Sequence, residues 1–166
     1  MVERTALVNK KEMNYEGIFS VKALYEVIDT FAKTHGYIKV ELLANEKVQK
    51  DGRYIRLVIE LHKQMSEYAK SVLGIDIRLE HVRDVTTEHE GKKYERNQGK
   101  CIFVFDAFHE SDFEHKWENK PGFFFIRILF DKYLFKPFIT DFNGKIMTDH
   151  MALYNELRAH LHLHKY

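Results

Sequence analysis

Apolar and polar residues alternate along three segments between residues 37 and 85, and this period of two limits most strongly what the chain can form. Successive side chains of a β-strand point to opposite faces, so alternation predicts strands with one buried face. Asp51-Gly52 separates the first two segments and favours a tight hairpin turn. We therefore expect antiparallel pairing of residues 37–44 with 55–62, followed by a third strand at residues 72–85. The predicted buried faces are Ile38, Val40, Leu42 and Ala44; Ile55, Leu57, Ile59 and Leu61; and Ile75, Ile77 and Leu79.

Two helices are predicted around these strands, because apolar residues there recur at intervals of three and four. The first follows Ser20, a good N-cap, and stops at Gly36, whereas the second begins near Thr148 and ends the chain. Residues 5–15 are expected to add a short edge strand before the first helix. The apolar stripes are Val21, Leu24, Ile28 and Phe31 in the first helix, and Met151, Leu153, Tyr154, Leu157 and Leu161 in the second.

Two further segments, residues 100–109 and 123–133, are apolar on both alternating faces. One face of each predicted strand is expected to pack on the helices. The second face would meet the interior of a curved sheet, a bound apolar ligand or another subunit. The polar residues 88–100 between the third strand and the fourth contain Gly91 and Gly99, and we interpret them as a long hairpin connection.

These elements predict an α+β fold with a curved antiparallel sheet of about five to six strands packed on a helix in the N-terminal half and a long C-terminal helix. No repeat or Pro/Gly/Ser-rich linker divides the chain, so residues 1–166 are expected to form one domain. A net charge of +1 gives no global field for nucleic acid or membranes. Cys101 is the only cysteine, residues 1–20 carry charges throughout, and no apolar run could span a bilayer, which predicts a cytoplasmic protein without internal disulfides or a membrane span.

The order strand, helix, antiparallel strands and terminal helix resembles the helix-grip architecture of the START-like and polyketide-cyclase (SRPBCC) superfamily. A second resemblance rests on Trp117, the aromatic run at residues 123–125 and Asp131-Lys132-Tyr133, which are similar to a pattern in small uncharacterised archaeal proteins. The first resemblance implies a curved sheet that wraps the terminal helix. It implies no reaction, because members of that superfamily bind, transfer or modify very different molecules.

Binding of an apolar small molecule or lipid is the leading functional hypothesis. Arg127 interrupts an apolar strand face, and either Asp106 on the neighbouring strand or a ligand anion would compensate its charge. The alternative is a protein–protein interaction or assembly module, including a homodimer, that buries the second apolar face, and Trp117 would then either close the core or face the partner. The predicted ligand-binding residues are Arg127, His62, Phe103, Phe105, Phe125 and Tyr154.

Sequence motifs for chemistry are scarce, since the chain has no phosphate-binding loop, dinucleotide fingerprint, zincin motif or nucleophile elbow. Catalysis and cofactors are therefore not expected, and Cys101 in an apolar strand is interpreted as an inert thiol. Two histidine groups have metal-ligand chemistry, against the simpler interpretations of a frayed helix end and a polar connector. They are His160, His162 and His164, and His109, Asp112 and His115, the latter also as acid/base candidates.

A third functional hypothesis is contact with nucleic acid or the ribosome through residues 92–100. Basic side chains there surround Tyr94, which could stack on a base while the cations meet phosphates. Glu88, Glu90 and Glu95 dilute this charge, so a solvated hairpin tip is the simpler interpretation. The residues of this candidate interface are Lys92, Lys93, Tyr94 and Arg96.

Overall fold

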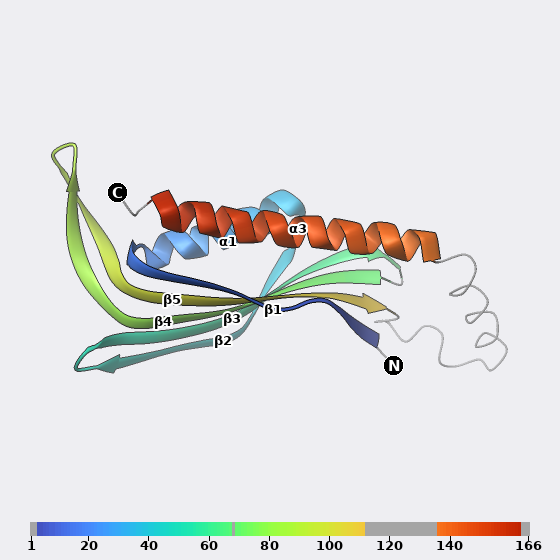
Figure 1. Ribbon diagram of the computed structural model, residues 1–166, viewed down its shortest axis with the longest axis horizontal. Helices are drawn as coiled ribbons and strands as arrows, with labels where there is room; N and C mark the ends of the chain where they lie inside the picture. The colour runs from blue at the N-terminus through green and yellow to red at the C-terminus, as the bar shows by residue number, and fades with distance from the viewer. Residues whose placement is uncertain (1–2, 68, 112–135, 164–166) are drawn as a thin grey trace.

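A sheet of five antiparallel strands dominates the part of the chain that the structure describes, and two helices cover one of its faces (Figure 1). The structure is a computed structural model and describes residues 3–67, 69–111 and 136–163. The strand order is β1-β5-β4-β3-β2, so the first strand lies beside the last one described. The elements are β1 (Glu3–Phe19), α1 (Val21–His35), β2 (Ile38–Gln49), β3 (Gly52–Ser66), β4 (Ala69–His89), β5 (Lys92–Ser111) and α3 (Lys136–Leu163).

Helix α1 begins and ends where the sequence predicts. The Ser20 hydroxyl accepts a hydrogen bond from the Ala23 amide at 3.2 Å, which satisfies one of the free donors of the first turn. Gly36 adopts the left-handed conformation (φ 73°, ψ 32°), and Tyr37 N donates to Ala32 O at 2.7 Å. Leu24, Ile28, Phe31 and Ala32 form the buried stripe.

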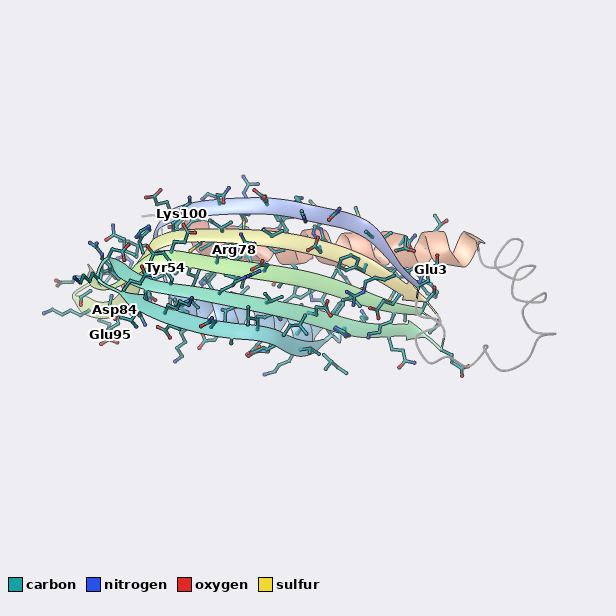
Figure 2. The ribbon with its side chains drawn as sticks, turned by 90° about the horizontal axis from the view of Figure 1, so that it is seen from below. Glu3, Tyr54, Arg78, Asp84, Glu95 and Lys100 are labelled. Carbon is teal, nitrogen blue, oxygen red and sulfur yellow. The ribbon has the colours of Figure 1, made fainter. Side chains whose placement is uncertain are left out.

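We call the sheet face under α1 and α3 the inner face and the opposite one the outer face. The predicted alternation of β3 and β4 is confirmed, because their buried apolar series point inward and their charged residues outward. Strand β5 is apolar on both faces, as predicted, because Ile102, Val104 and Phe108 lie partly buried on its outer face. On the outer face Asp76 accepts from Arg56 at 3.2 and 3.0 Å and from Arg78 at 3.0 Å, and Figure 2 shows this face from below. The fully buried inner residues include Ile59, Leu61, Leu73, Ile75, Ile77, Leu79, Phe103 and Phe105.

The predicted buried face of β2 is wrong. Ile38 and Val40 pair with His62 and Glu60 on the outer face, and the two residues are 72% and 38% exposed. The alternating polar residues point inward instead, where Lys39 Nζ lies 2.5 Å from Asp29 of α1. Strand β2 lies at the edge of the sheet and has only one neighbouring strand, a position that its sequence pattern does not reveal. A shift of one residue in its pairing would exchange its two faces, so the alternation alone does not determine which face is buried.

The polar residues 88–100 are not a connection but paired strand, which is a second correction. The ladder between β4 and β5 continues to His89 opposite Lys92, and only Glu90 and Gly91 lie in the turn. Both turn residues have positive φ (51° and 75°), as a two-residue hairpin turn of the primed type requires. The hairpin itself was predicted, but its strands are longer.

Helix α3 begins at Lys136, twelve residues before the predicted N-cap at Thr148. The Thr148 hydroxyl donates within the helix to Gly144 O at 2.9 Å, so it caps nothing. Met151, expected in the apolar stripe, is 41% exposed and Tyr154 is partly buried. The buried stripe has helical spacing from residue 146 onward: Ile146, His150, Leu153, Leu157 and Leu161.

Strand β1 is an edge strand, as predicted, but it spans Glu3–Phe19 rather than residues 5–15 alone. Register shifts between Ala6 and Lys11 interrupt its pairing with β5, and such bulges make an edge less open to further pairing. The predicted strand at residues 123–133 lies outside the described residues. Within those residues, no helix is both long and apolar enough to cross a membrane.

Candidate functional site

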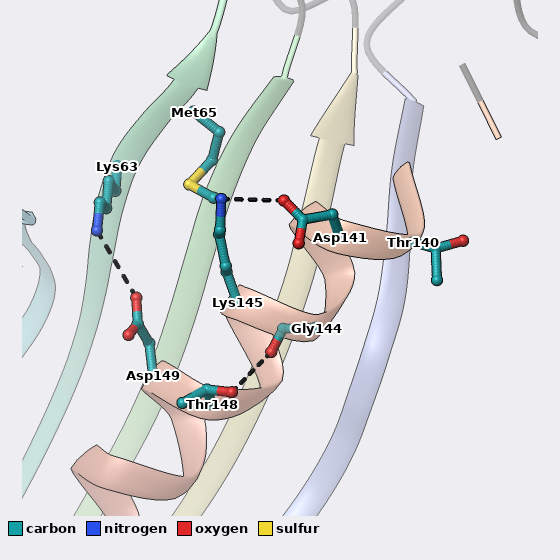
Figure 3. A pocket seen from close by; sticks show the side chains of 8 residues that line it. All are labelled: Lys63, Met65, Thr140, Asp141, Gly144, Lys145, Thr148 and Asp149. Carbon is teal, nitrogen blue, oxygen red and sulfur yellow. Dashed lines mark hydrogen bonds and ion pairs between the residues drawn. The ribbon is translucent and has the colours of Figure 1, made fainter. Parts of the chain in front are cut away.

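An open groove of about 690 Å³ lies between the end of β3 and the first half of α3 (Figure 3). Lys63 and Met65 come from β3, and α3 contributes the other lining residues. Lys145 forms an ion pair with Asp141 at 3.0 Å, one helical turn away. Most of the lining is thus polar, with charges of both signs. The residues from α3 are Thr140, Asp141, Gly144, Lys145, Thr148 and Asp149.

A buried hydrogen-bonded chain reaches the wall of this groove. The Tyr37 hydroxyl donates to Asp149 Oδ2 at 2.8 Å and lies 3.0 Å from Ser71 Oγ, which can donate to it in turn. Tyr37 is 6% exposed and Ser71 is fully buried, so water does not replace these bonds. Burial raises the pKa of Tyr37, and the hydrogen bond to Asp149 raises it further, so the phenol remains a donor at neutral pH.

Lys63 completes the polar wall from the other side. Its ammonium lies 3.8 Å from Asp149 Oδ2 and 5.2 Å from the centre of the Tyr37 ring. Asp149 therefore accepts a hydrogen bond from Tyr37 and lies near one cation. Lys63 is one-third exposed, so its ammonium can also reach the groove. A ligand in the groove would meet a cationic donor and a carboxylate acceptor held a few ångströms apart.

Two histidines are buried on the inner side of the sheet, and their ring nitrogens are incompletely paired. His109 lies opposite Ser71 in the ladder and is 7% exposed, and its Nε2 has no hydrogen-bond partner among the described residues. His150 of α3 is 1% exposed, and neither of its ring nitrogens has such a partner. Burial lowers the pKa of both imidazoles, although a hydrogen bond with Asn143 acts in the opposite direction on His109.

The predicted ligand-binding residues do not gather around one cavity. Phe103 and Phe105 are fully buried in core packing, whereas the partly buried Tyr154 packs on Phe105 at 5.3 Å between ring centres and lines a smaller groove of about 330 Å³ beside β1. His62 lies on the outer face, where its Nε2 is 2.7 Å from Glu60 Oε2, because residue 62 is out of phase with the inward series of β3. Arg127 and Phe125 lie outside the described residues.

The predicted metal ligands are only partly described. His160 and His162 lie on α3, where a spacing of two residues directs side chains to different faces. His164, Asp112 and His115 lie outside the described residues, and so does Trp117. No group of three or more His, Cys, Asp or Glu side chains suited to a metal ion occurs in the described part of the chain.

Two remaining candidates have clear structural environments. Cys101 is fully buried, and burial raises the pKa of its thiol to about 12, which disfavours the thiolate that a nucleophile needs. Asp106, the expected partner of Arg127, accepts a hydrogen bond from the Lys10 amide at 2.8 Å, where β1 is bulged. Lys92, Lys93, Tyr94 and Arg96 lie near the tip of the β4–β5 hairpin, far along the sheet from the groove.

Sequence reasoning missed Tyr37, Ser71, Lys63 and Asp149. The sequence contained a signal for Ser71 alone, since this residue lies between Ala69 and Leu73 in the buried inward series of β4. A polar residue in such a series needs a buried partner. The partners are 34 positions away for Tyr37 to Ser71 and 112 positions away for Tyr37 to Asp149, which no local pattern can reveal.

Comparisons of the chain with protein-family models, with curated proteins and with solved structures give no match.

Proposed function

We propose that this chain is a small-molecule-binding protein whose ligand enters the groove between β3 and α3. The observation that carries the proposal is the buried chain of Ser71, Tyr37 and Asp149, which ends at the groove beside Lys63. Strands β3 and β4, helix α3 and Tyr37 in the loop after α1 contribute to it. Buried polar groups are costly if any of them lacks a hydrogen-bond partner, and apolar side chains could fill the same space without that cost. We therefore infer that this arrangement serves binding.

The topology supports this location. In the helix-grip architecture that the element order resembles, a sheet wraps the terminal helix and leaves binding space between them. Here β1 lies beside β5, and α1 and α3 share one face of the sheet (Figure 1). Helix α3 runs along this face, and the groove opens beside its first half. A volume of about 690 Å³ lies in the range of small-molecule sites.

The lining favours an amphipathic ligand over the purely apolar one expected from the sequence. Lys63 and Lys145 suit an anionic or carbonyl group, and Asp149 suits a hydroxyl or amine. Met65 and the methyl groups of Thr140 and Thr148 supply limited apolar contact. Of the aromatic residues predicted as lining, Phe103 and Phe105 are fully buried in the core and Tyr154 is partly buried, and none of these three lines the groove.

Native mass spectrometry of the purified full chain is the first test, because gentle ionisation retains bound molecules. We expect a monomer mass accompanied by a discrete additional mass. The second test uses 1-anilinonaphthalene-8-sulfonate, an amphipathic probe whose sulfonate would meet Lys63 or Lys145 and whose rings would meet Met65 and the threonine methyl groups. Gly144→Leu would fill the groove, since a Cβ at Gly144 has no described atom within 4 Å. We expect this variant to bind the probe at least about tenfold more weakly.

Asn155→Leu is the matched control, because residue 155 is exposed on the same helix and lines neither this groove nor a smaller one of about 330 Å³ beside β1. It should bind the probe like the parent chain. Equal affinities of the parent and Gly144→Leu would place the probe elsewhere and refute the groove as the binding site.

A second candidate function is self-association through β2. Strand β2 is the other edge of the sheet, and its exposed apolar side chains form the densest such group among the described residues. We propose that two copies pair along this edge, since an unpaired strand with apolar side chains is a template for another strand. The residues are Ile38, Val40, Leu42, Leu43 and Val48, which are 38–78% exposed.

Sedimentation equilibrium tests this alternative. A dimer that becomes monomeric in Leu42→Glu would support it. Met147→Glu is the control, because Met147 is a 39% exposed apolar residue on α3, away from the edge. A parent chain that remains monomeric at all concentrations studied would refute the pairing.

A further inference from the structure

The β4–β5 hairpin extends beyond the rest of the sheet as a free two-stranded ribbon. Pairing with β3 ends at Val82 and pairing with β1 ends at Asn97, but the ladder between β4 and β5 continues to His89 opposite Lys92. In Figure 1 the ribbon is the green and yellow arm that curves toward the side of the helices. We refer to residues 83–98 as the ribbon, although Asn97 and Gln98 at its base still pair with β1. Each of its strands is about 20 Å long.

A bulge directs the ribbon away from the sheet. The register shifts between Glu80 and Arg83, and His81 has a positive φ of 54°. Glycines flank this bulge on both sides: a Cβ on Gly99 would lie 2.7 Å from Glu80 O, and one on Gly52 would lie 2.8 Å from the His81 carbonyl carbon. Neighbouring backbones therefore hold the base of the ribbon in close contact.

The ribbon separates its charges by face. Residues directly opposite each other in the ladder share a face, so the pairs from Arg83–Gln98 to His89–Lys92 define two faces. All acidic side chains of the paired residues lie on one of them. The cationic face consists of Arg83, Val85, Thr87, His89, Lys92, Tyr94, Arg96 and Gln98, and the acidic face of Asp84, Thr86, Glu88, Lys93, Glu95 and Asn97.

Because of this separation, the basic cluster seen in the sequence forms a surface without the acidic residues that are its neighbours along the chain. Glu88 and Glu95 dilute the cluster along the chain, but they point away from Lys92, Tyr94 and Arg96. The ribbon twists along its length, yet the two faces remain on opposite sides at every pair. The cationic face therefore carries positive charge without an acidic side chain among its paired residues.

Within the described part of the chain, Arg83, Lys92 and Arg96 of this face have no carboxylate partner. Lys92 and Arg96 form no ion pair with any described residue, and Arg83 Nε donates only to the Asp51 carbonyl at 3.1 Å. By contrast, cations on the outer face of the main sheet are paired, as Arg56 and Arg78 are with Asp76. Arg96 lies over the ring of Tyr94 at 5.2 Å, and Tyr94 is 38% exposed.

We propose that the cationic face of the ribbon binds single-stranded nucleic acid. Arg83, Lys92 and Arg96 would contact successive phosphates, and Tyr94 would stack on an unpaired base. The Arg96 guanidinium already lies over the Tyr94 ring, so a base would enter a site with a cation and an aromatic face side by side. This function is separate from ligand binding in the groove.

The acidic face decides between a single strand and a duplex. A ribbon inserted into a duplex groove has phosphates on both sides, and Glu88 and Glu95 would then face one of the backbones. A single strand can lie along one face only, away from these carboxylates. The charge separation therefore favours an unpaired strand.

Fluorescence anisotropy of a labelled oligonucleotide of about twelve nucleotides, measured with the full chain at low salt, tests the proposal. Three phosphate contacts predict a slope of log K against log salt of about −2, and loss of one contact should reduce that slope by about 0.7. Lys92→Glu and Arg96→Glu should each weaken binding at least about tenfold. Tyr94→Ala should weaken it at least about fivefold, whereas Tyr94→Phe should retain binding.

Lys93→Glu is the matched control, because it makes the same charge change one residue away on the acidic face. It should change the affinity less than about twofold. Equal losses for Lys92→Glu and Lys93→Glu would refute the face as the binding surface. Tighter binding to a duplex of the same sequence, or binding only to vesicles that contain phosphatidylserine, would refute the single-stranded partner. Circular dichroism of each variant confirms folding, since all these residues lie at the ribbon surface.

Discussion

The hydroxyl of Tyr37 is the most informative atom to remove, because it connects Ser71 and Asp149 inside the protein. Tyr37→Phe retains the ring and deletes two hydrogen bonds. The bond to the carboxylate contributes about 1.5–3 kcal/mol and the bond with Ser71 about 0.5–1.5 kcal/mol, and Ser71 is left fully buried without this partner. We expect the free energy of unfolding to fall by about 2–4 kcal/mol in urea titrations followed by far-UV circular dichroism.

The double variant makes this prediction specific. Ser71→Ala alone removes one bond, but in the Tyr37→Phe background it also removes the unpaired hydroxyl, so the two losses should not add. We expect the loss in the double variant to be smaller than the sum of the single losses by about 1 kcal/mol, within the range of coupling between residues in contact. Additive losses, or a Tyr37→Phe variant within about 0.5 kcal/mol of the parent, would show that the hydrogen-bonded chain does not form.

Three further predictions concern stability. Gly144→Ala should raise the free energy of unfolding by about 1 kcal/mol and Tm by about 2–4 °C in calorimetry, because glycine disfavours a helix interior and no described atom would clash; a lower Tm would refute the open groove. Gly99→Ala should lower that free energy by about 1–3 kcal/mol in urea titrations, since its Cβ would meet Glu80 O at 2.7 Å, and an unchanged value would refute the tight bulge. Burial lowers the pKa of His150 below its ordinary 6.5, so the folded state binds fewer protons than the unfolded state near that pH. The folded protein is therefore most stable, with respect to this group, above about pH 6.5, and it loses stability as the pH falls below that value. His150→Leu should therefore gain stability relative to the parent between pH 7.5 and 5, and parallel pH profiles would contradict a neutral buried imidazole.

The parts of the fold that depend on neighbouring residues were predictable from the sequence. Ser20 and Gly36 bound α1 through hydrogen bonds within one turn. The β2–β3 hairpin was also predicted, although its turn consists of Lys50 and Asp51, one residue before the predicted Asp51-Gly52, and Gly52 pairs with Gln49. The burial of β2 was not predictable, because it depends on where the strand lies in the sheet. Residues 88–100 looked like a loop because both faces of a free ribbon are solvated and need no apolar series.

The two candidate sites also differ in whether their residues are neighbours in the sequence, and only the site made of sequence neighbours could be predicted. Lys92, Tyr94 and Arg96 are close in sequence, so their cluster was visible, but the ladder was needed to show that the acids point away. The groove is lined by β3 and α3, and the hydrogen-bonded chain behind it adds Tyr37 from the loop after α1 and Ser71 from β4, so only the folded sheet brings these residues together. Local clusters can be proposed from sequence, whereas sites assembled across a sheet require its register.

Strand β4 connects the two proposed sites and also separates them. Ser71 lies near its start beside the groove, and Arg83 begins the ribbon twelve residues later, which corresponds to about 40 Å along the strand. The buried series of Leu73, Ile75, Ile77 and Leu79 fills the interval, and close-packed cores resist gradual deformation. Substitutions at the two ends share no partner, so their effects on stability and binding should add, and coupling between them would require the sheet itself to have two arrangements.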